Sequence, residues 1–335
     1  ITDHHIPGEA LPNAFAILNP KQADCTYPFK GLCGSGVALK LLNGIGQKLN
    51  ASFDLIVDLM DLVSLGTSAD LVPMIDENRI IVHYGLQTLR TTLRPGLREL
   101  LKVANIDLAR ELTVTQVVFH IAPRINAAGR LGDANRSVKL LTTTDHSLAE
   151  QLAVELDKEN KTRQTIQKSV VNDALLQVNC EVDLEKDKAI VLGSKGWHQG
   201  VVGIVASKVK ETFNRPTIII SFDEEGNGKG SARSIKGLDL YKALSASSKF
   251  LDTFGGHAMA GGLSIHESKL DEFKKLFFTY VDKALSQDDL ESSLILDGEV
   301  SLADINNRFL DILKKLGPYG PGNMRPKFAL MKVQV

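Results

Sequence analysis

The sequence predicts an α/β fold in which two α/β lobes are joined by one long helix and followed by a segment of different character. Residues 147–180 are charged and periodic and contain neither Gly nor Pro, which is typical of a continuous helix. Residues 181–287 alternate strand-like and helix-like segments, the pattern of a small α/β domain. Because 335 residues exceed one average domain, we divide the chain into 1–146, 147–180, 181–287 and 288–335.

The composition limits the possible partners and the cellular location. With 39 basic and 40 acidic residues the formal charge is -1, so binding of a polyanion would depend on a local basic patch. The three cysteines, Cys25, Cys33 and Cys180, are widely spaced, which argues against a disulfide framework and a zinc ribbon. No apolar run approaches the roughly 20 residues that a membrane span needs. We therefore expect a soluble, cytoplasmic protein that has no membrane partner.

The first lobe contains three predicted segments before the long helix. Residues 31–49 predict a helix after a Gly-rich start, and tight packing explains these glycines better than phosphate binding, since no GK[ST] follows. Residues 53–70 predict a helix with two different sides. Asp54, Asp58 and Asp61 form a solvated acidic side. The other, mainly apolar side contains Phe53, Ile56, Val57, Met60, Val63 and Ser64. Residues 117–121 predict a strand that breaks at Pro123 into a loop.

The sequence of the second lobe predicts alternating strands and helices. The expected strands are 188–193, 217–222, a Gly-rich pair around 226–235, and 263–266, and the expected helices are 200–213, 239–254 and 267–285. Residues 288–335 differ in character and end in "ALMKVQV", which predicts one strand without its partners.

Asp3, His4 and His5 form the first group of candidate functional residues. Two adjacent histidines on a strand point to opposite faces, so they cannot chelate one ion together as an i, i+4 pair on a helix can. At the end of a strand one His could meet a metal and the other a metal-bound substrate. The alternative is that both are ordinary satisfied histidines.

A second group is Arg124, Asn126 and Arg130 in "APRINAAGRLG". Guanidinium groups bind phosphate oxygens bidentately, so these residues could form a phosphate fork. The alternative is that each arginine pairs with an acidic neighbour such as Asp133.

The third group lies in the second lobe and could hold a nucleic-acid strand. Its members are cations, hydroxyls, glycines that allow close backbone approach, and an aromatic and a His before a helix: Lys229, Ser231, Arg233, Ser234, Gly255, Gly256, His257, Trp197 and His198. The alternative is that the glycines form hairpin turns and that Trp197 packs in a core.

Together these motifs resemble the DHH phosphoesterase superfamily, and within it the RecJ-type single-strand exonucleases. "TDHH" resembles the motif that names the superfamily, and "LVSLGTSADLVPMIDENRIIV" and "APRINAAGRLGDANRSVKLL" resemble RecJ-type stretches. "GWHQGVVGIVASKVKETFNRPTIII", "GKGSARSI" and "FGGHAMAGGLSI" resemble the DHH-associated second domain, and "LGPYGPGNMRPKF" resembles the lead into an OB-fold. The resemblance implies that the chain holds the remainder of a DHH domain, a DHH-associated domain and the start of an OB-fold.

The resemblance also implies a function. It is 5′ to 3′ hydrolysis of single-stranded DNA in repair and recombination, with two divalent cations, manganese or magnesium, as cofactors. Asp3, His4 and Asp70 would bind metal, and His5 would lie near the scissile phosphate. Arg124, Asn126 and Arg130 would line the catalytic cleft, and the residues of the third group would hold the strand. A single-strand-binding protein and a helicase are the implied protein partners.

The sequence departs from the family pattern at its beginning. The family carries two further aspartate motifs before its DHH motif, whereas here only Ile1 and Thr2 precede Asp3. We therefore expect a fragment that lacks part of its metal site and cleaves weakly or not at all. Two alternatives stay open: a small phosphodiesterase of the same superfamily acting on oligoribonucleotides or cyclic dinucleotides, and a noncatalytic DNA-binding scaffold.

Overall fold

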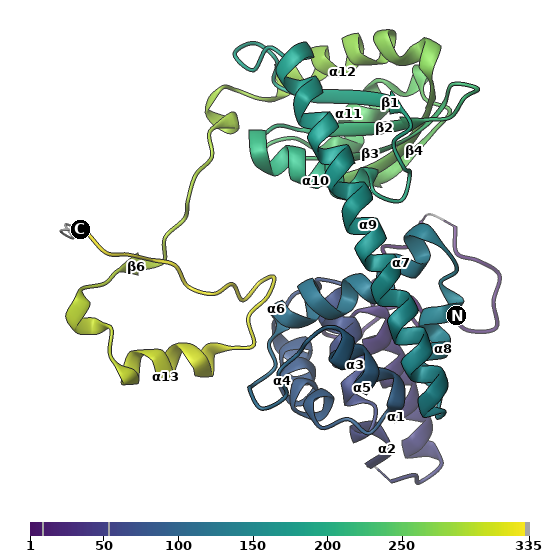
Figure 1. Cartoon of the computed structure of the whole chain (residues 1–335), viewed down its shortest axis with the longest axis vertical. Helices are drawn as coiled ribbons and strands as arrows, with labels where there is room; N and C mark the ends of the chain where they lie inside the picture. Colours follow the sequence, from purple (N-terminus) through teal and green to yellow (C-terminus); the bar gives the residue numbers. More distant parts are fainter. Residues whose placement is uncertain (9, 53, 332–335) are drawn as a thin grey trace. The chain divides into compact units, whose positions relative to one another are not determined.

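The computed structural model describes residues 1–8, 10–52 and 54–331, and the chain forms two compact units (Figure 1). Unit 1 comprises Ile1–Gly129, Asp133–Lys158 and Ile295–Val335, and unit 2 comprises Arg130–Gly132 and Glu159–Leu294. The helix α9 (His146–Glu181) passes from one unit to the other. It confirms the long helix expected over 147–180, and the chain as a whole is α/β as predicted.

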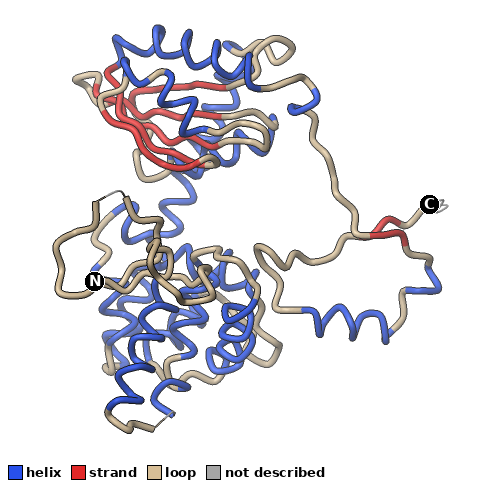
Figure 2. Tube along the Cα trace, turned by 180° about the vertical axis from the view of Figure 1, so that it is seen from behind, coloured by secondary structure: helices blue, strands red, loops and turns tan. Residues whose placement is uncertain are grey.

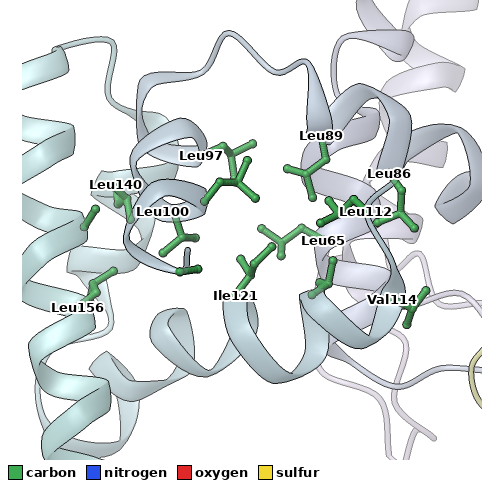
Figure 3. Packing of buried hydrophobic residues seen from close by; sticks show 14 of the residues in the cluster. Leu65, Leu86, Leu89, Leu97, Leu100, Leu112, Val114, Ile121, Leu140 and Leu156 are labelled. Atoms are coloured by element: carbon green, nitrogen blue, oxygen red, sulfur yellow. The ribbon is translucent and has the colours of Figure 1, made fainter. Parts of the chain in front are cut away.

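Unit 1 is built mainly from helices, shown in blue in Figure 2. They are α1 (Gly34–Lys48), α2 (Asp54–Val57), α3 (Met60–Ala69), α4 (Asp76–Arg90), α5 (Pro95–Val103), α6 (Val114–Gln116), α7 (Ala122–Leu131) and α8 (Asn135–Thr142). Leucines at helical spacing on α4 and α5 meet α8 and the first half of α9 in one apolar core (Figure 3), which includes Leu89, Leu97, Leu100, Leu140 and Leu156. This core fixes the scaffold on which the amino-terminal segment lies.

The helix expected over 53–70 is interrupted, and one of its acidic residues is not solvated. α2 ends at Val57 and α3 begins at Met60, while Phe53 lies outside the described residues. Asp54 and Asp58 are exposed as expected, but Asp61 is only 2% exposed. Its carboxylate accepts hydrogen bonds from Thr92 Oγ1 (2.7 Å) and Arg94 Nε (3.2 Å). A buried aspartate is tolerated here because it is paired.

The strand expected over residues 117–121 is wrong. Val117–Ile121 is a π-helical turn that continues from α6 into α7, so residues 122–131 are helical rather than a loop. Val117, Ile121, Ala122 and Ala128 are buried, at spacings that fit a helix facing the core. Pro123 is the second residue of α7, directly after the π turn, and its missing N–H removes one backbone hydrogen bond at this irregular point of the helix.

Unit 2 holds a five-stranded sheet of order β1-β2-β3-β5-β4. Its elements are β1 (Ile190–Lys195), α10 (Val202–Phe213), β2 (Thr217–Phe222), β3 (Asn227–Arg233), α11 (Leu240–Ala246), β4 (Thr253–His257), β5 (Ala260–His266) and α12 (Leu270–Ala284). β1 and β2 are parallel and joined through α10, and the other pairs are antiparallel. Most of the expected strands and helices are confirmed, with two exceptions. The Gly-rich pair expected around 226–235 is the single strand β3, and the helix expected over 239–254 ends at Ala246 and its last residues begin β4.

Helices cover both faces of this sheet. Alternate residues Ile190, Leu192 and Ile219 pack with α10 and the end of α9, while Val191, Ile218 and Ile220 pack in the cluster that contains α11 and α12. This alternation follows the two-residue period of a strand. It places Lys229, Ser231 and Arg233 of β3 together on one face of the sheet.

The last segment belongs to unit 1 and forms no closed barrel among its described residues. β6 (Gly298–Glu299) pairs in parallel with β7 (Phe328–Ala329), and α13 (Asn307–Leu316) lies between them in sequence. Phe328 and Ala329 supply the expected final strand in part, and residues 332–335 lie outside the described residues. Among the described residues, no helix has the length and apolar character to cross a membrane.

Candidate metal and phosphate sites

Asp3, His4 and His5 gather their side chains at the start of unit 1. One potential ligand atom from each residue lies within 4.8 Å of the others. Asp3 Oδ1 accepts hydrogen bonds from the backbone N–H of His4 (2.7 Å) and from Nδ1–H of His5 (2.9 Å). Hydrogen bonds from the His5 ring and from the backbone of His5 and His4 lower the pKa of Asp3 to about 2. Asp3 is therefore a carboxylate at neutral pH and can act as a metal ligand.

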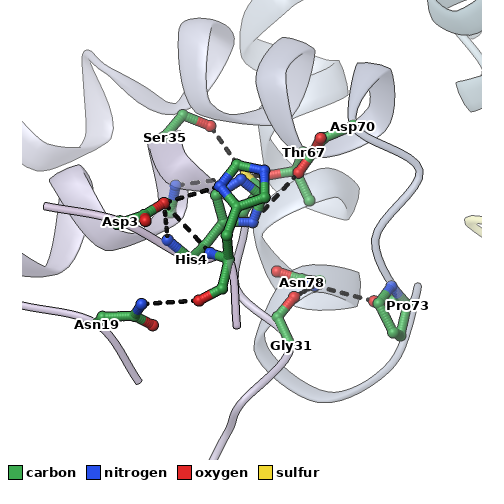
Figure 4. Close-up of polar contacts among 12 residues, drawn as sticks. Asp3, His4, Asn19, Gly31, Ser35, Thr67, Asp70, Pro73 and Asn78 are labelled. Atoms are coloured by element: carbon green, nitrogen blue, oxygen red, sulfur yellow. Dashed lines mark hydrogen bonds and ion pairs between the residues drawn. The ribbon is translucent and has the colours of Figure 1, made fainter. Parts of the chain in front are cut away.

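Asp70 comes to this group from the end of α3. Its Oδ2 lies 3.5 Å from Nδ1 of His4, whose side chain is 15% exposed (Figure 4). Contacts on both sides of His4 fix its position. Before it, the backbone of residues 1–3 forms hydrogen bonds with the backbone of Leu18; after it, Asn19 Nδ2 donates to the His5 carbonyl (2.8 Å). The structure thus groups Asp3 and His4 with His5, and places Asp70, the third residue expected to bind metal, beside His4.

These donors fit a hard divalent cation. Two carboxylates and an imidazole suit Mn²⁺, and Mg²⁺ accepts the same carboxylates with water in its remaining positions. His5 has an exposed side chain (77%) that is oriented by its hydrogen bond to Asp3. Its Nε2 has no hydrogen-bond partner among the described residues and is available for a bound substrate.

Arg124 and Asn126 do not form the expected fork. Arg124 lies in α7 with its side chain 13% exposed, and it pairs with Asp157 (2.8 Å) and donates to backbone carbonyls. The pairing alternative therefore holds for Arg124, with Asp157 rather than Asp133 as its partner. Asn126 is exposed on the same helix.

Arg130 belongs instead to a cluster of arginines in unit 2. Burial, with the positive charge of Arg130, lowers the pKa of both Arg163 and Arg233, and no carboxylate contributes to either shift. Arg233 donates to Ser207 Oγ (3.1 Å) and Ser231 Oγ (2.9 Å), and Arg130 donates to the carbonyl of Gly200 (3.1 Å). Guanidinium groups that feel one another's charge, with no carboxylate contributing, favour an oxyanion.

The absence of a side chain at Gly203 lets α10 lie close to Ser231 and Arg233. A Cβ at Gly203 would lie 3.1 Å from Ser231 Oγ and 3.2 Å from Arg233 Nη2. Arg163 was missed by the sequence reading, because it lies in the charged periodic stretch that predicts α9. It is 8% exposed and bonds Asn160 and Gln167 rather than an acid, so only the fold distinguishes it from the surface arginines.

Two of the residues expected to bind a strand are internal. Trp197 is 6% exposed in the core formed by α9, α10 and the sheet, so it offers no face on which a base could stack. Ser234 is 1% exposed, and its hydroxyl donates to the carbonyl of Leu238 (2.9 Å). Because both side chains are buried, the expectation that they contact a strand is corrected. Their burial is not visible in the local sequence.

The remaining residues of that group lie at accessible positions. Lys229, His198 and His257 are exposed, and Nδ1 of each of these two histidines accepts a local backbone N–H. Gly255 and Gly256 lie in the edge strand β4. Gly256 has φ +141, and a Cβ there would lie 2.3 Å from the carbonyl oxygen of Ala260, so the hairpin itself requires this glycine.

Three family models match the chain. The model of the DHH family, N-terminal domain, matches residues 1–67, the DHHA1 domain model matches residues 186–283, and the RecJ OB domain model matches residues 296–335. These matches fall in the order expected from the sequence.

Curated and solved proteins are similar over nearly the whole chain. The single-stranded-DNA-specific exonuclease RecJ of Bacillus subtilis (strain 168) is 41% identical over 327 residues, which cover 97% of this chain and 40% of the relative. The structure of RecJ from Thermus thermophilus in complex with Mn²⁺ has a TM-score of 0.87 at 32% identity, covering 98% of this chain and 47% of that one. A structure of exonuclease RecJ bound to manganese has a TM-score of 0.70 at 33% identity, covering 86% of this chain and 71% of that one. The chain spans 40% to 60% of the length of the first curated relatives.

Proposed function

The chain belongs to the RecJ family of DHH phosphoesterases, and from this premise we propose that it serves the 5′ to 3′ hydrolysis of single-stranded DNA in repair and recombination. The observation that carries the proposal is the cluster of Asp3, His4 and His5, with Asp70 beside His4. Divalent cations, manganese or magnesium, are the proposed cofactors. When bound, they supply positive charge to the attacking and leaving oxygens of the phosphodiester.

The residues of the site would have different roles in metal binding and phosphate contact. Asp3, His4 and Asp70 hold the cations, and the carboxylate of Asp3 also orients the His5 ring through the Nδ1 bond of 2.9 Å. His5 then has Nε2 free to face a phosphate, to which its imidazolium form would donate Nε2–H. Asn126, which is exposed, could reach a strand, whereas Arg124 would act only through its ion pair with Asp157.

Unit 2 would bind the strand by its phosphates. Arg130, Ser231 and Arg233 offer a guanidinium fork and a hydroxyl for a phosphate group, and the strand's 5′ end is the proposed occupant. Lys229, His198, Gly255, Gly256 and His257 would contact the backbone that follows. A phosphate-directed site of this kind reads no base sequence, which suits an exonuclease.

The wider assignments are also part of the proposal. Residues 1–146 would form the carboxyl-terminal part of the DHH domain, 147–180 the connecting helix, 181–287 the DHH-associated domain and 288–335 the start of an OB-fold. We propose a cytoplasmic location, supported by the free Cys25, Cys33 and Cys180. A single-strand-binding protein and a helicase are proposed partners.

Digestion of single-stranded DNA labelled at either end tests the function. The chain, and a version that carries any natural sequence preceding residue 1, are incubated with the strand in Mn²⁺. Release of nucleotides from the 5′ end by either version, abolished by Asp3→Asn, supports the proposal. Strand binding by both without cleavage would instead favour the noncatalytic scaffold, and cleavage restricted to short oligoribonucleotides would favour the small phosphodiesterase.

A further inference from the structure

The segment that follows the metal-site residue Asp70 has an unusual backbone. Asp70 is the C-cap of α3, and Leu71–Ile75 connects it to α4. Leu71 (φ 55) adopts a left-handed conformation, which L residues other than Asn and Asp seldom do, and so does Asp76 (φ 48), which follows the segment. Such a conformation persists only where the surroundings hold it. Asp70 is held on one side by α3 and is followed directly by this segment, so the contacts of the segment bear on its position.

Asn78 holds the segment from one side. It is 0% exposed, and its Nδ2 donates to the carbonyls of Pro73 (3.0 Å) and Gly31 (2.7 Å), as Figure 4 shows. Gly31 leads into α1, whose first residue, Gly34, lies against the His4 ring. One buried amide thus joins the segment after Asp70 to the chain that packs on His4.

The carboxyl-terminal part of unit 1 holds the same segment from the other side. The backbone N–H of Met74 donates to the carbonyl of Pro321 (2.5 Å), and Gly320 packs so closely on Met74 that a Cβ there would lie 3.1 Å from Met74 Cβ. The turn that makes these contacts, residues 317–323, is fixed by Arg79. Its Nη2 donates to the carbonyls of Lys315, Leu316 and Gly317 at 3.2 to 3.3 Å.

We propose that Asn78 and the turn 317–323 are positioning elements for Asp70, so that cation affinity in the DHH-type unit depends on contacts made by the carboxyl-terminal segment. This inference rests on the proposed metal role of Asp70. Neither element touches the cation. Each acts through the backbone of residues 73–75, as outer partners of metal ligands do.

The test measures Mn²⁺ affinity of the full chain by electron paramagnetic resonance of the free ion, with Mn²⁺ alone and no DNA. Asn78→Leu removes two donors, and Arg79→Met releases the turn. Each is expected to lower the affinity about tenfold or more, the usual effect of losing an outer partner. Hydrogen exchange of the Met74 amide, measured without metal, is expected to accelerate in both variants.

Matched controls remove contacts of the same kind elsewhere in unit 1. Thr92→Val breaks the buried hydrogen bond to Asp61 at the opposite end of α3 (2.7 Å), and Lys314→Met breaks the ion pair of α13 with Glu111 (2.9 Å). Both are expected to leave Mn²⁺ affinity and Met74 exchange unchanged. Asp70→Asn serves as the reference for loss of a ligand.

The outcomes separate the inference from the proposed function. If Asp70→Asn weakens Mn²⁺ binding but Asn78→Leu and Arg79→Met do not, the inference is overturned and the metal site stands. If Asp70→Asn has no effect, the metal assignment itself fails and takes the inference with it. An equal loss in the control variants would show general loosening and also overturn the inference. Should Asn78→Leu not fold, Arg79→Met alone decides.

Discussion

Arg233 is half-buried in a cluster of positive charges, and its removal should weaken strand binding but not metal binding. Arg233→Ala removes the guanidinium beside Ser231 and Ser207, and hydrogen bonds to charged groups are worth about 1.5 to 3 kcal/mol. We expect a fall of about tenfold or more in affinity for 5′-phosphorylated single-stranded DNA, measured by fluorescence anisotropy at fixed salt. Mn²⁺ affinity should not change, because Arg233 lies in unit 2 and the metal residues lie in unit 1.

Lys236→Ala is the matched control for Arg233→Ala. Lys236 is exposed just after β3, so its loss changes the net charge by the same amount outside the cluster. We expect little change in DNA affinity. Equal weakening by both variants would contradict a specific phosphate site and would indicate general attraction of the strand by positive charge.

His4 and His5 are adjacent in sequence, yet we expect them to respond differently to substitution. His4, 15% exposed and beside Asp70, is a proposed ligand, so His4→Ala should lower Mn²⁺ affinity at least about tenfold. His5, 77% exposed, is proposed to contact the phosphate. His5→Ala should therefore keep most of the Mn²⁺ affinity while slowing DNA cleavage. Calorimetry of Mn²⁺ binding checks the first expectation, and end-labelled digestion checks the second; the reverse pattern would exchange their roles.

Sequence reasoning named candidate site residues but did not predict their partners. The order Asp3, His4, His5 is visible in the sequence, and Asp70 follows from the resemblance. By contrast, Arg124 is paired by Asp157, 33 positions away, and no local signal distinguishes this arginine from Arg130. Pairing of a charged side chain is decided by tertiary packing, which a local pattern does not encode.

Helix α3 depends on one buried aspartate. Asp61→Ala would leave Thr92 and Arg94 without their acceptor, which costs about 1 to 3 kcal/mol when the group is buried. We expect the free energy of unfolding to fall by that amount, measured by urea denaturation followed by far-UV circular dichroism. Asp54→Ala, at an exposed position of α2, should change it by less than about 0.5 kcal/mol. Equal effects would mean that Asp61 is solvated in solution.

The contact of α5 with α8 leaves no room for a side chain at Gly96. A Cβ there would lie 1.8 Å from the carbonyl oxygen of Leu140, so Gly96→Ala must push the two helices apart. Overpacking of this kind costs about 1 to 3 kcal/mol. Gly44→Ala in α1, with nothing within 4 Å of its Cβ, should stabilise by up to about 1 kcal/mol through helix propensity. Thermal unfolding of both variants checks the opposite signs.

Long, uninterrupted patterns predicted elements well, and short apolar runs did not. α9 was predicted because 36 residues without Gly or Pro have few alternatives. The pattern of the five residues 117–121 fits a strand and a helix equally. In the structure they are helical because they continue α6 into α7. The β4–β5 hairpin was hidden because its Gly residues suggested a loop, although Gly256 is required for the close pairing of these strands.

The formal charge of -1 for the whole chain predicts how strand binding should depend on salt. With no global positive field, attraction must come from the local cations proposed to meet the strand, Arg130, Lys229 and Arg233. If about three phosphates are neutralised, the logarithm of the association constant should fall with the logarithm of salt concentration with a slope of about -2 for a single strand. Anisotropy titrations without divalent cations between low and moderate salt measure this slope. Arg233→Ala should make it shallower by about 0.7, whereas a slope steeper than about -5 would require a broad basic surface that the arginine cluster does not provide.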